Sequence, residues 1–170
     1  MAEYTLIRSS RRTLAIEITR DCRLIVRAPR RCPVSQIERF LSERRDWIEK
    51  HMALQQARME AHPEPDADEE ARLRALAKEV LPEKLRYYSE IMGLYPEGIT
   101  ITGARTRFGS CSGKNRISFS FRLMQYPDEA IDYVVVHELA HILHKNHGKE
   151  FYALIESVLP DWQRRRALLK

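Results

Sequence analysis

The chain has 170 residues, 44% of them hydrophobic, which suits one globular domain or one domain with a helical appendage. No apolar run approaches the roughly 18 residues of a membrane-spanning helix, so we expect no membrane segment. The N-terminal sequence has neither the apolar block nor the cleavage site of a signal peptide. Cys22, Cys32 and Cys111 form no CxxC pair, as is typical of free thiols, and we expect a cytoplasmic protein.

The net charge is +5, and arginine is densest near the two ends of the chain. Such clusters can attract nucleic acid or phosphorylated substrates. No nucleic-acid-binding motif accompanies them, so an ordinary solvated cationic surface is the favoured interpretation.

The first half of the chain predicts a hairpin followed by two long helices. Alternating apolar residues predict a β-hairpin over 12–29, and apolar residues at helical spacing predict a helix over 35–59. A polar, acidic linker with two prolines covers 60–70. A second long helix is expected from Glu70, with a kink or break at Pro82.

The second half returns to strands and then to helices. Alternation predicts strands over 98–104 and 116–124, joined by the polar loop TRFGSCSGKN. Pro127 and Asp128 open a helix, and two shorter helices follow, the last after Pro160. This order of elements predicts an α+β fold with an antiparallel or mixed sheet.

The sequence HELAH, from His137 to His141, is an HExxH motif. Two histidines four apart on a helix can both reach one ion. The surrounding helix is apolar almost all round, which predicts burial, and buried polar groups without partners are costly. One metal ion would satisfy His137, Glu138 and His141 together. The less favoured alternative is two core histidines with hydrogen-bonded neighbours and a salt-bridged glutamate.

A catalytic zinc ion needs a third protein ligand and an open position for water. His144 lies a further turn along the helix and could reach the ion only if the helix ended early. His147 could reach it if the chain doubled back, and Lys145-Asn146-His147-Gly148 suits such a turn because Asn tolerates the left-handed conformation. The turn favours His147 over His144.

Three neutral histidines leave the ion its full charge, which lowers the pKa of a bound water. Glu138 is placed to take the proton from that water and to deliver it to a leaving group. The predicted chemistry is hydrolysis assisted by one Zn²⁺ or a similar divalent ion.

Residues 104–162 resemble the core of the YgjP-like metallopeptidases, relatives of the SprT-like zinc proteins, and the hairpin and first long helix fit as well. The matching positions are Arg107, Gly109, Ser110, Cys111, Arg122, Leu123, Pro127, Tyr133, His137, Glu138, His141, Asn146, His147, Phe151, Pro160 and Asp161. Phe108 and Tyr152 replace the usual Trp, and Ser120 replaces the usual Asn. The resemblance implies His147 as third ligand and one domain over 1–170, with the hairpin and helices in 1–95 and a zincin-like core in 96–170.

The loop RFGSCSG allows two interpretations. Arg107, Ser110 and Ser112, together with Arg122, could bind a substrate oxyanion or phosphate with the help of backbone N–H groups. The loop could equally be a tight connection between two strands. A nucleophilic role for Cys111 would need a lowered pKa and a nearby base, and a small buried thiol is favoured instead.

A zinc-dependent metallohydrolase of the peptidase type is the favoured function. The alternatives are a metal-dependent nucleoside triphosphate pyrophosphohydrolase and, less favoured, a non-catalytic zinc module that binds nucleic acid or protein. The first two activities have both been linked to the resembled family, and Glu138 weighs against the third because a structural site has no use for a base. A peptidase should expose an edge strand, for which RISFSFRLM is the candidate. A nucleotide enzyme should gather basic side chains around the metal: Arg105, Arg107, Lys114, Arg116 and Arg122.

Overall fold

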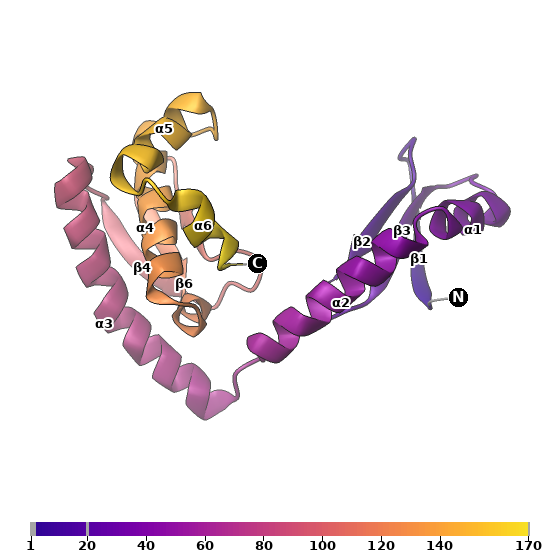
Figure 1. Ribbon diagram of the computed structural model, residues 1–170, viewed down its shortest axis with the longest axis horizontal. Helices are drawn as coiled ribbons and strands as arrows, with labels where there is room; N and C mark the ends of the chain where they lie inside the picture. Colours follow the sequence, from indigo (N-terminus) through magenta and orange to yellow (C-terminus); the bar gives the residue numbers. More distant parts are fainter. Residues whose placement is uncertain (1–2, 20, 170) are drawn as a thin grey trace. The chain divides into compact units, whose positions relative to one another are not determined.

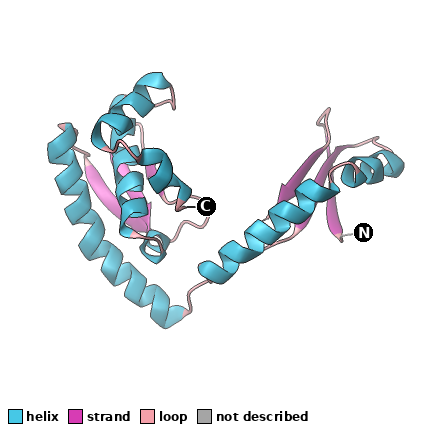
Figure 2. Ribbon diagram, in the orientation of Figure 1, coloured by secondary structure: helices cyan, strands magenta, loops and turns pink. Residues whose placement is uncertain are grey.

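The computed structural model describes residues 3–19 and 21–169, and the chain divides into two compact units, Met1–Glu64 and Pro65–Lys170. Each unit combines helices with a small three-stranded mixed sheet (Figures 1 and 2). The predicted α+β fold is confirmed. None of the described helices has the length and apolarity needed to cross a bilayer.

The sheet of the first unit contains β1 (Tyr4–Ser9), β2 (Ala15–Ile18) and β3 (Leu24–Pro29). β3 lies in the centre, parallel to β1 and antiparallel to β2, so the hairpin predicted over 12–29 is confirmed. Alternate residues of β3 point into the core of this unit. The core contains Val26, Ala28, Cys32 and Ile37.

The helix predicted over 35–59 is two helices, α1 (Val34–Ser42) and α2 (Arg45–Ala61). Between them the N–H of Arg44 bonds to the carbonyl oxygen of Leu41 at 3.2 Å, a three-residue turn that ends the first helix. Helical spacing of apolar residues continues across this turn, so the periodicity alone did not reveal the break.

The second unit begins with α3 (Ala67–Met92), which Asp66 caps by accepting the N–H of Glu69 and which ends at Gly93 in the left-handed conformation, φ 65°. The break expected at Pro82 is absent, because the helix is packed against the core on both sides of the proline. The buried residues that flank it are Leu73, Ala77, Leu81 and Leu85.

The second sheet contains β4 (Gly98–Thr102), β5 (Gly109–Cys111) and β6 (Arg116–Ser120), in the order β4-β6-β5. β6 is parallel to β4 and antiparallel to β5. The loop between the two predicted strands therefore supplies a third strand, β5, which the sequence pattern did not predict.

The predicted strand over 116–124 stops at Ser120, where a 3₁₀ helix, η1 (Phe121–Gln125), begins. The Ser120 hydroxyl accepts the N–H of Arg122 at 3.4 Å and donates to the carbonyl oxygen of Ala104 at 2.7 Å. These bonds cap the 3₁₀ helix and end the strand.

Three helices complete the unit: α4 (Asp128–Leu143), α5 (Lys149–Val158) and α6 (Trp162–Ala167). α4 contacts α3, α5, α6 and β5 (Figure 1), which explains why the residues around HExxH are apolar on nearly every side. The side chains of the sheet that share this core include Ile117 and Phe119, both fully buried.

Candidate metal centre

His137 and His141 project from the last two turns of α4, with ring centroids 4.9 Å apart. The motif lies within the helix, as its spacing predicts. Because four residues make slightly more than one turn, both imidazoles leave the same face of the helix.

The chain reverses directly after α4. His144 is the C-cap, in an extended conformation (φ −116°, ψ 102°), and the N–H of Gly148 bonds to the carbonyl oxygen of Asn146 at 2.9 Å. The left-handed residue expected at Asn146 is absent, since its φ is not positive. The extended C-cap makes the reversal instead, and it brings His147 back to the helix.

His147 lies with His137 and His141, and the three potential ligand atoms are within 4.8 Å of one another. The Nε2 atoms of His137 and His147 are 3.1 Å apart. Tetrahedral zinc with Zn–N bonds of about 2.05 Å separates its nitrogen ligands by about 3.3 Å. The donor set and the spacing both fit a zinc-type ion.

The remaining ring nitrogens are oriented by neighbouring groups. Nδ1 of His141 lies 2.9 Å from the carbonyl oxygen of His144, and Nδ1 of His137 lies 3.3 Å from the Tyr133 hydroxyl. A carbonyl oxygen can only accept, so Nδ1 of His141 carries the proton and Nε2 is left with its lone pair. Such outer contacts set the tautomer and the orientation of metal-binding imidazoles.

Phe151, fully buried on α5, forms the floor of the cluster. Its ring centroid lies 4.9 Å from His137, 4.6 Å from His141 and 4.8 Å from His147. An apolar floor keeps water from that side of the ring cluster and confines the three imidazoles to one arrangement.

The protein keeps two of these histidines neutral. Burial, assisted by His141, His147 and Arg166, lowers the pKa of His137 to about 3. Burial also lowers the pKa of His141, and His147 adds to the effect. A neutral imidazole is the form that binds a metal.

Glu138 is buried beside the cluster, and its Oε2 atom has no hydrogen-bond partner among the described residues. Burial raises the pKa of Glu138 to about 7, against the opposing positive charge of Arg107. β5 passes directly over the carboxylate: a Cβ atom at Gly109 would lie 2.6 Å from Cγ and Oε1 of Glu138. A carboxyl group poised near neutral pH in a confined space can act as a general base.

Two of the predicted substrate-binding residues, Arg107 and Ser110, line one cavity, and Ser112 and Arg122 do not line it. Arg107 is exposed, yet its charge acts on Glu138. Ser110 lies on the face of β5 opposite Gly109 and lines a cavity of about 100 Å³. The Ser112 hydroxyl accepts the backbone N–H of Arg116 in the β5–β6 turn, and the guanidinium of Arg122 lies over the Phe121 ring.

Two of the basic residues predicted to surround a nucleotide, Arg116 and Lys114, do not line the cavity that Arg107 lines. Arg116 donates to the carbonyl oxygen of Glu97, and Lys114 is exposed in the β5–β6 turn. Of the five predicted cations, Arg107 is the one whose charge lowers the pKa of Glu138. Burial raises the pKa of Cys111, which disfavours the thiolate that a nucleophile requires.

Tyr133, Phe151 and Gly109 contact the ligands or Glu138, although the sequence indicated no role for them beyond their match to the family pattern. Tyr133 had a second signal, since it lies four residues before His137, the spacing of neighbours on one helical face. Phe151 and Gly109 had no such local signal, because α5 and β5 meet α4 only in the folded chain. The ring of His144, the alternative ligand, is outside the cluster, with Nδ1 3.8 Å from Glu150.

Comparison with protein families relates this chain to metallopeptidases. The family model described as YgjP-like, metallopeptidase domain, matches residues 12–76 and 68–170. Among solved structures, the metallopeptidase zymogen of Pyrococcus abyssi abylysin is 22% identical with a TM-score of 0.47, over 52% of this chain and 88% of that chain. None of the curated proteins matches.

Proposed function

The chain belongs to the YgjP-like metallopeptidase family, and on that basis we propose that it is a zinc-dependent peptidase. In this proposal His137, His141 and His147 hold one ion, and Glu138 is the general base. The observation that carries the proposal is the buried carboxylate of Glu138, adjacent in sequence to His137 of the three-imidazole cluster, with an Oε2 atom that has no hydrogen-bond partner in the described part of the chain.

A bound zinc ion supplies Lewis acidity, which lowers the pKa of water and polarises a carbonyl oxygen. Glu138 takes a proton from the attacking water and passes it to the nitrogen of the leaving amine. Arg107 keeps part of the Glu138 population ionised near neutral pH, because its positive charge opposes the effect of burial on the pKa. The open side of the three-histidine cluster, away from Phe151, is where the substrate enters.

We propose that an extended peptide pairs with β5. β6 lies between β4 and β5, so the segment RISFSFRLM, expected to be an edge strand, is central and cannot accept a substrate strand. β4 and β5 are the two edges, and among the described strands β5 pairs with β6 alone. Since β5 crosses Glu138 at Gly109, a peptide added to its free edge lies next to the catalytic carboxylate.

The arrangement of the basic residues favours a peptide over a nucleoside triphosphate as substrate. Several phosphate groups require several cations or an array of N–H donors in one place. The cations that act on this centre do so at separate residues: Arg107 on Glu138, Arg166 on His137 and Lys145 on His141. Substrate contacts by Ser110, Ser112 and Arg122 stay predictions, and Arg107 is the residue of that set that the proposal uses.

One substrate panel tests the proposal. The parent and Glu138→Gln are incubated with zinc and either an unfolded protein, short peptides or nucleoside triphosphates. We expect the parent to cleave peptide bonds and Glu138→Gln to bind zinc normally while losing about 10²–10⁴-fold in rate. Glu90→Gln, an exposed glutamate of α3, serves as the matched control and should retain the parent's rate. Triphosphate cleavage without peptide cleavage would refute the proposed substrate class.

A further inference from the structure

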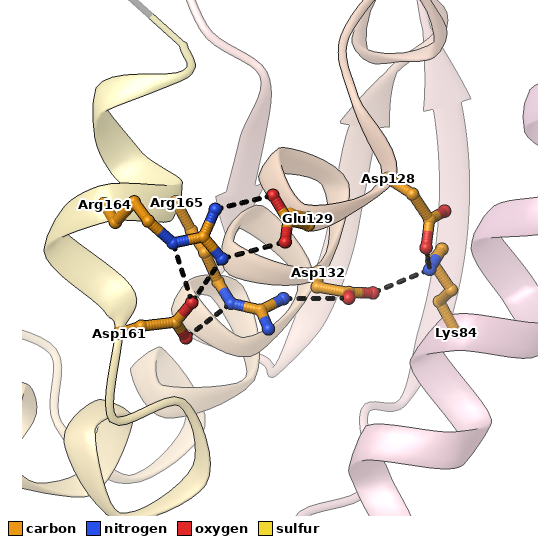
Figure 3. A network of polar contacts seen from close by, with 7 residues as sticks. All are labelled: Lys84, Asp128, Glu129, Asp132, Asp161, Arg164 and Arg165. Atoms are coloured by element: carbon orange, nitrogen blue, oxygen red, sulfur yellow. Dashed lines mark hydrogen bonds and ion pairs between the residues drawn. The ribbon is translucent and has the colours of Figure 1, made fainter.

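A network of seven charged residues joins α6 to α4 and α4 to α3 (Figure 3). Arg165 bridges Asp132 of α4 at 3.1 Å and Asp161 at 2.7 Å, while Arg164 forms a forked pair with Glu129 at 2.8 Å. On its other side Asp132 accepts from Lys84 of α3 at 2.6 Å. The network fixes the start of α6 against the helix that carries HExxH.

Trp162, the first residue of α6, packs against two tyrosines. Its ring stacks on Tyr152 at a centroid distance of 4.8 Å and an interplanar angle of 20°. It also lies nearly parallel to the Tyr133 ring, at 6.3 Å and 15°. Both distances fall in the range in which aromatic rings attract one another.

Each of these tyrosines contacts a different histidine of the centre. The Tyr133 hydroxyl lies 3.3 Å from Nδ1 of His137, and the Tyr152 ring lies 6.3 Å from that of His147. His137 is on α4, whereas His147 is on the loop that follows it. A displacement of Trp162 would therefore release ligands on two separate segments.

We propose that Trp162 is a positioning residue of the metal centre, acting through the two tyrosines that it packs against. The ion pairs of Asp161, Arg164 and Arg165 hold α6 in the place where this packing is possible. The inference rests on the proposed function, since it takes the three histidines to hold the ion. It assigns a role to the Pro160-Asp161 segment, which contributes no atom to the cluster.

Zinc affinity tests this inference independently of catalysis. Metal-free protein is titrated with Zn²⁺ in competition with a chromogenic chelator. We expect Trp162→Ala to bind zinc about 10–100-fold more weakly than the parent, the usual cost of losing an outer contact to a metal ligand. Trp162→Phe should recover most of that affinity, because phenylalanine keeps a flat ring for stacking. Trp47→Ala, which removes the chain's other tryptophan, should bind as the parent does.

Parent-like affinity in a folded Trp162→Ala variant, as judged by circular dichroism, would overturn the inference. If that variant does not fold, Tyr133→Phe decides, because it removes only the hydroxyl that faces His137. Unchanged zinc affinity in Tyr133→Phe would then overturn it, and a loss of about 10-fold would support it. If the parent binds zinc but cleaves no peptide, the proposed function is refuted, and the comparison of zinc affinities between the parent and the variants remains valid. A parent that binds no zinc refutes both.

Discussion

Gly109 and Glu138 are in such close contact that no other residue type fits at position 109 without displacement of the carboxylate. A Cβ atom there would lie 2.6 Å from both Cγ and Oε1 of Glu138 and 2.8 Å from Cδ. The contact joins the edge strand β5 to the helix that bears the metal-binding motif. It therefore joins the proposed base to β5, the strand with which the substrate peptide is proposed to pair.

Gly109→Ala should destabilise the protein by about 1–3 kcal/mol, the usual cost of overpacking a buried site, and should also lower peptide hydrolysis. The added methyl group must push Glu138 or β5 out of place. Urea unfolding and a rate assay measure the two effects. Gly113→Ala is the control, because nothing lies within 4 Å of a Cβ atom at that glycine. Equal stability of the two variants would contradict the observed contact.

Replacing His147 and His144 by alanine separates the two candidate third ligands. His147→Ala should weaken zinc binding by more than about 100-fold, since changes in outer contacts alone cost 10–100-fold. His144→Ala should bind zinc nearly as the parent does. Its ring lies outside the cluster, and alanine retains the backbone carbonyl that accepts Nδ1–H of His141. Metal analysis after dialysis should find one zinc per chain in the parent, and the reverse order of the two variants would exclude His147.

Asp132 should matter far more to stability than Asp128, although both accept from Lys84. The Asp132 side chain is 14% exposed and also pairs with Arg165, so Asp132→Ala removes the more buried carboxylate partner of two largely buried cations. Arg165 keeps Asp161 and Lys84 keeps Asp128, but these carboxylates are more exposed. We expect a loss of about 2–3 kcal/mol in the free energy of unfolding. Asp128 is 73% exposed, and Asp128→Ala should cost at most about 1 kcal/mol. Chemical denaturation of both variants measures the two losses. Similar losses of unfolding free energy in Asp132→Ala and Asp128→Ala would show that burial does not determine the contribution of these ion pairs.

The attachment of α6 should weaken in acid. Arg164 lowers the pKa of Glu129, and Arg165 and Arg164 lower that of Asp161. A carboxyl group whose pKa is lower in the folded than in the unfolded state stabilises the fold at pH values above its unfolded pKa, which is about 4. That stabilisation is lost as the pH falls through the pKa of the folded state.

The parent should therefore be more stable than Arg164→Gln at pH 7, and the difference should shrink toward zero below about pH 4. Unfolding of both proteins by urea at a series of pH values measures it. Lys78→Gln, an exposed cation of α3, is the control and should show no such trend. A difference that grows in acid would contradict the assigned ion pairs.

Local patterns were enough to predict most helices and strands of this protein. The hairpin, the helix that bears HExxH and the order of elements follow from side-chain periodicity, which depends only on neighbouring residues. Two of the missed features depend on residues far away in the chain. Three-residue β5 is too short to show alternation and exists because β6 offers it hydrogen-bond partners. Continuity of α3 through Pro82 depends on core packing at Leu81 and Leu85.

The sequence by itself determined the metal-binding motif and the family. His137 and His141 share a face through the pitch of one helix, Glu138 adjoins them in the chain, and a linear comparison detects the family. Only the tertiary structure decided what surrounds them: Phe151 against the rings, Gly109 over the carboxylate, and Trp162 packed against two tyrosines. These contacts join segments far apart in the chain, and they depend on how helices and strands pack, which no local pattern encodes.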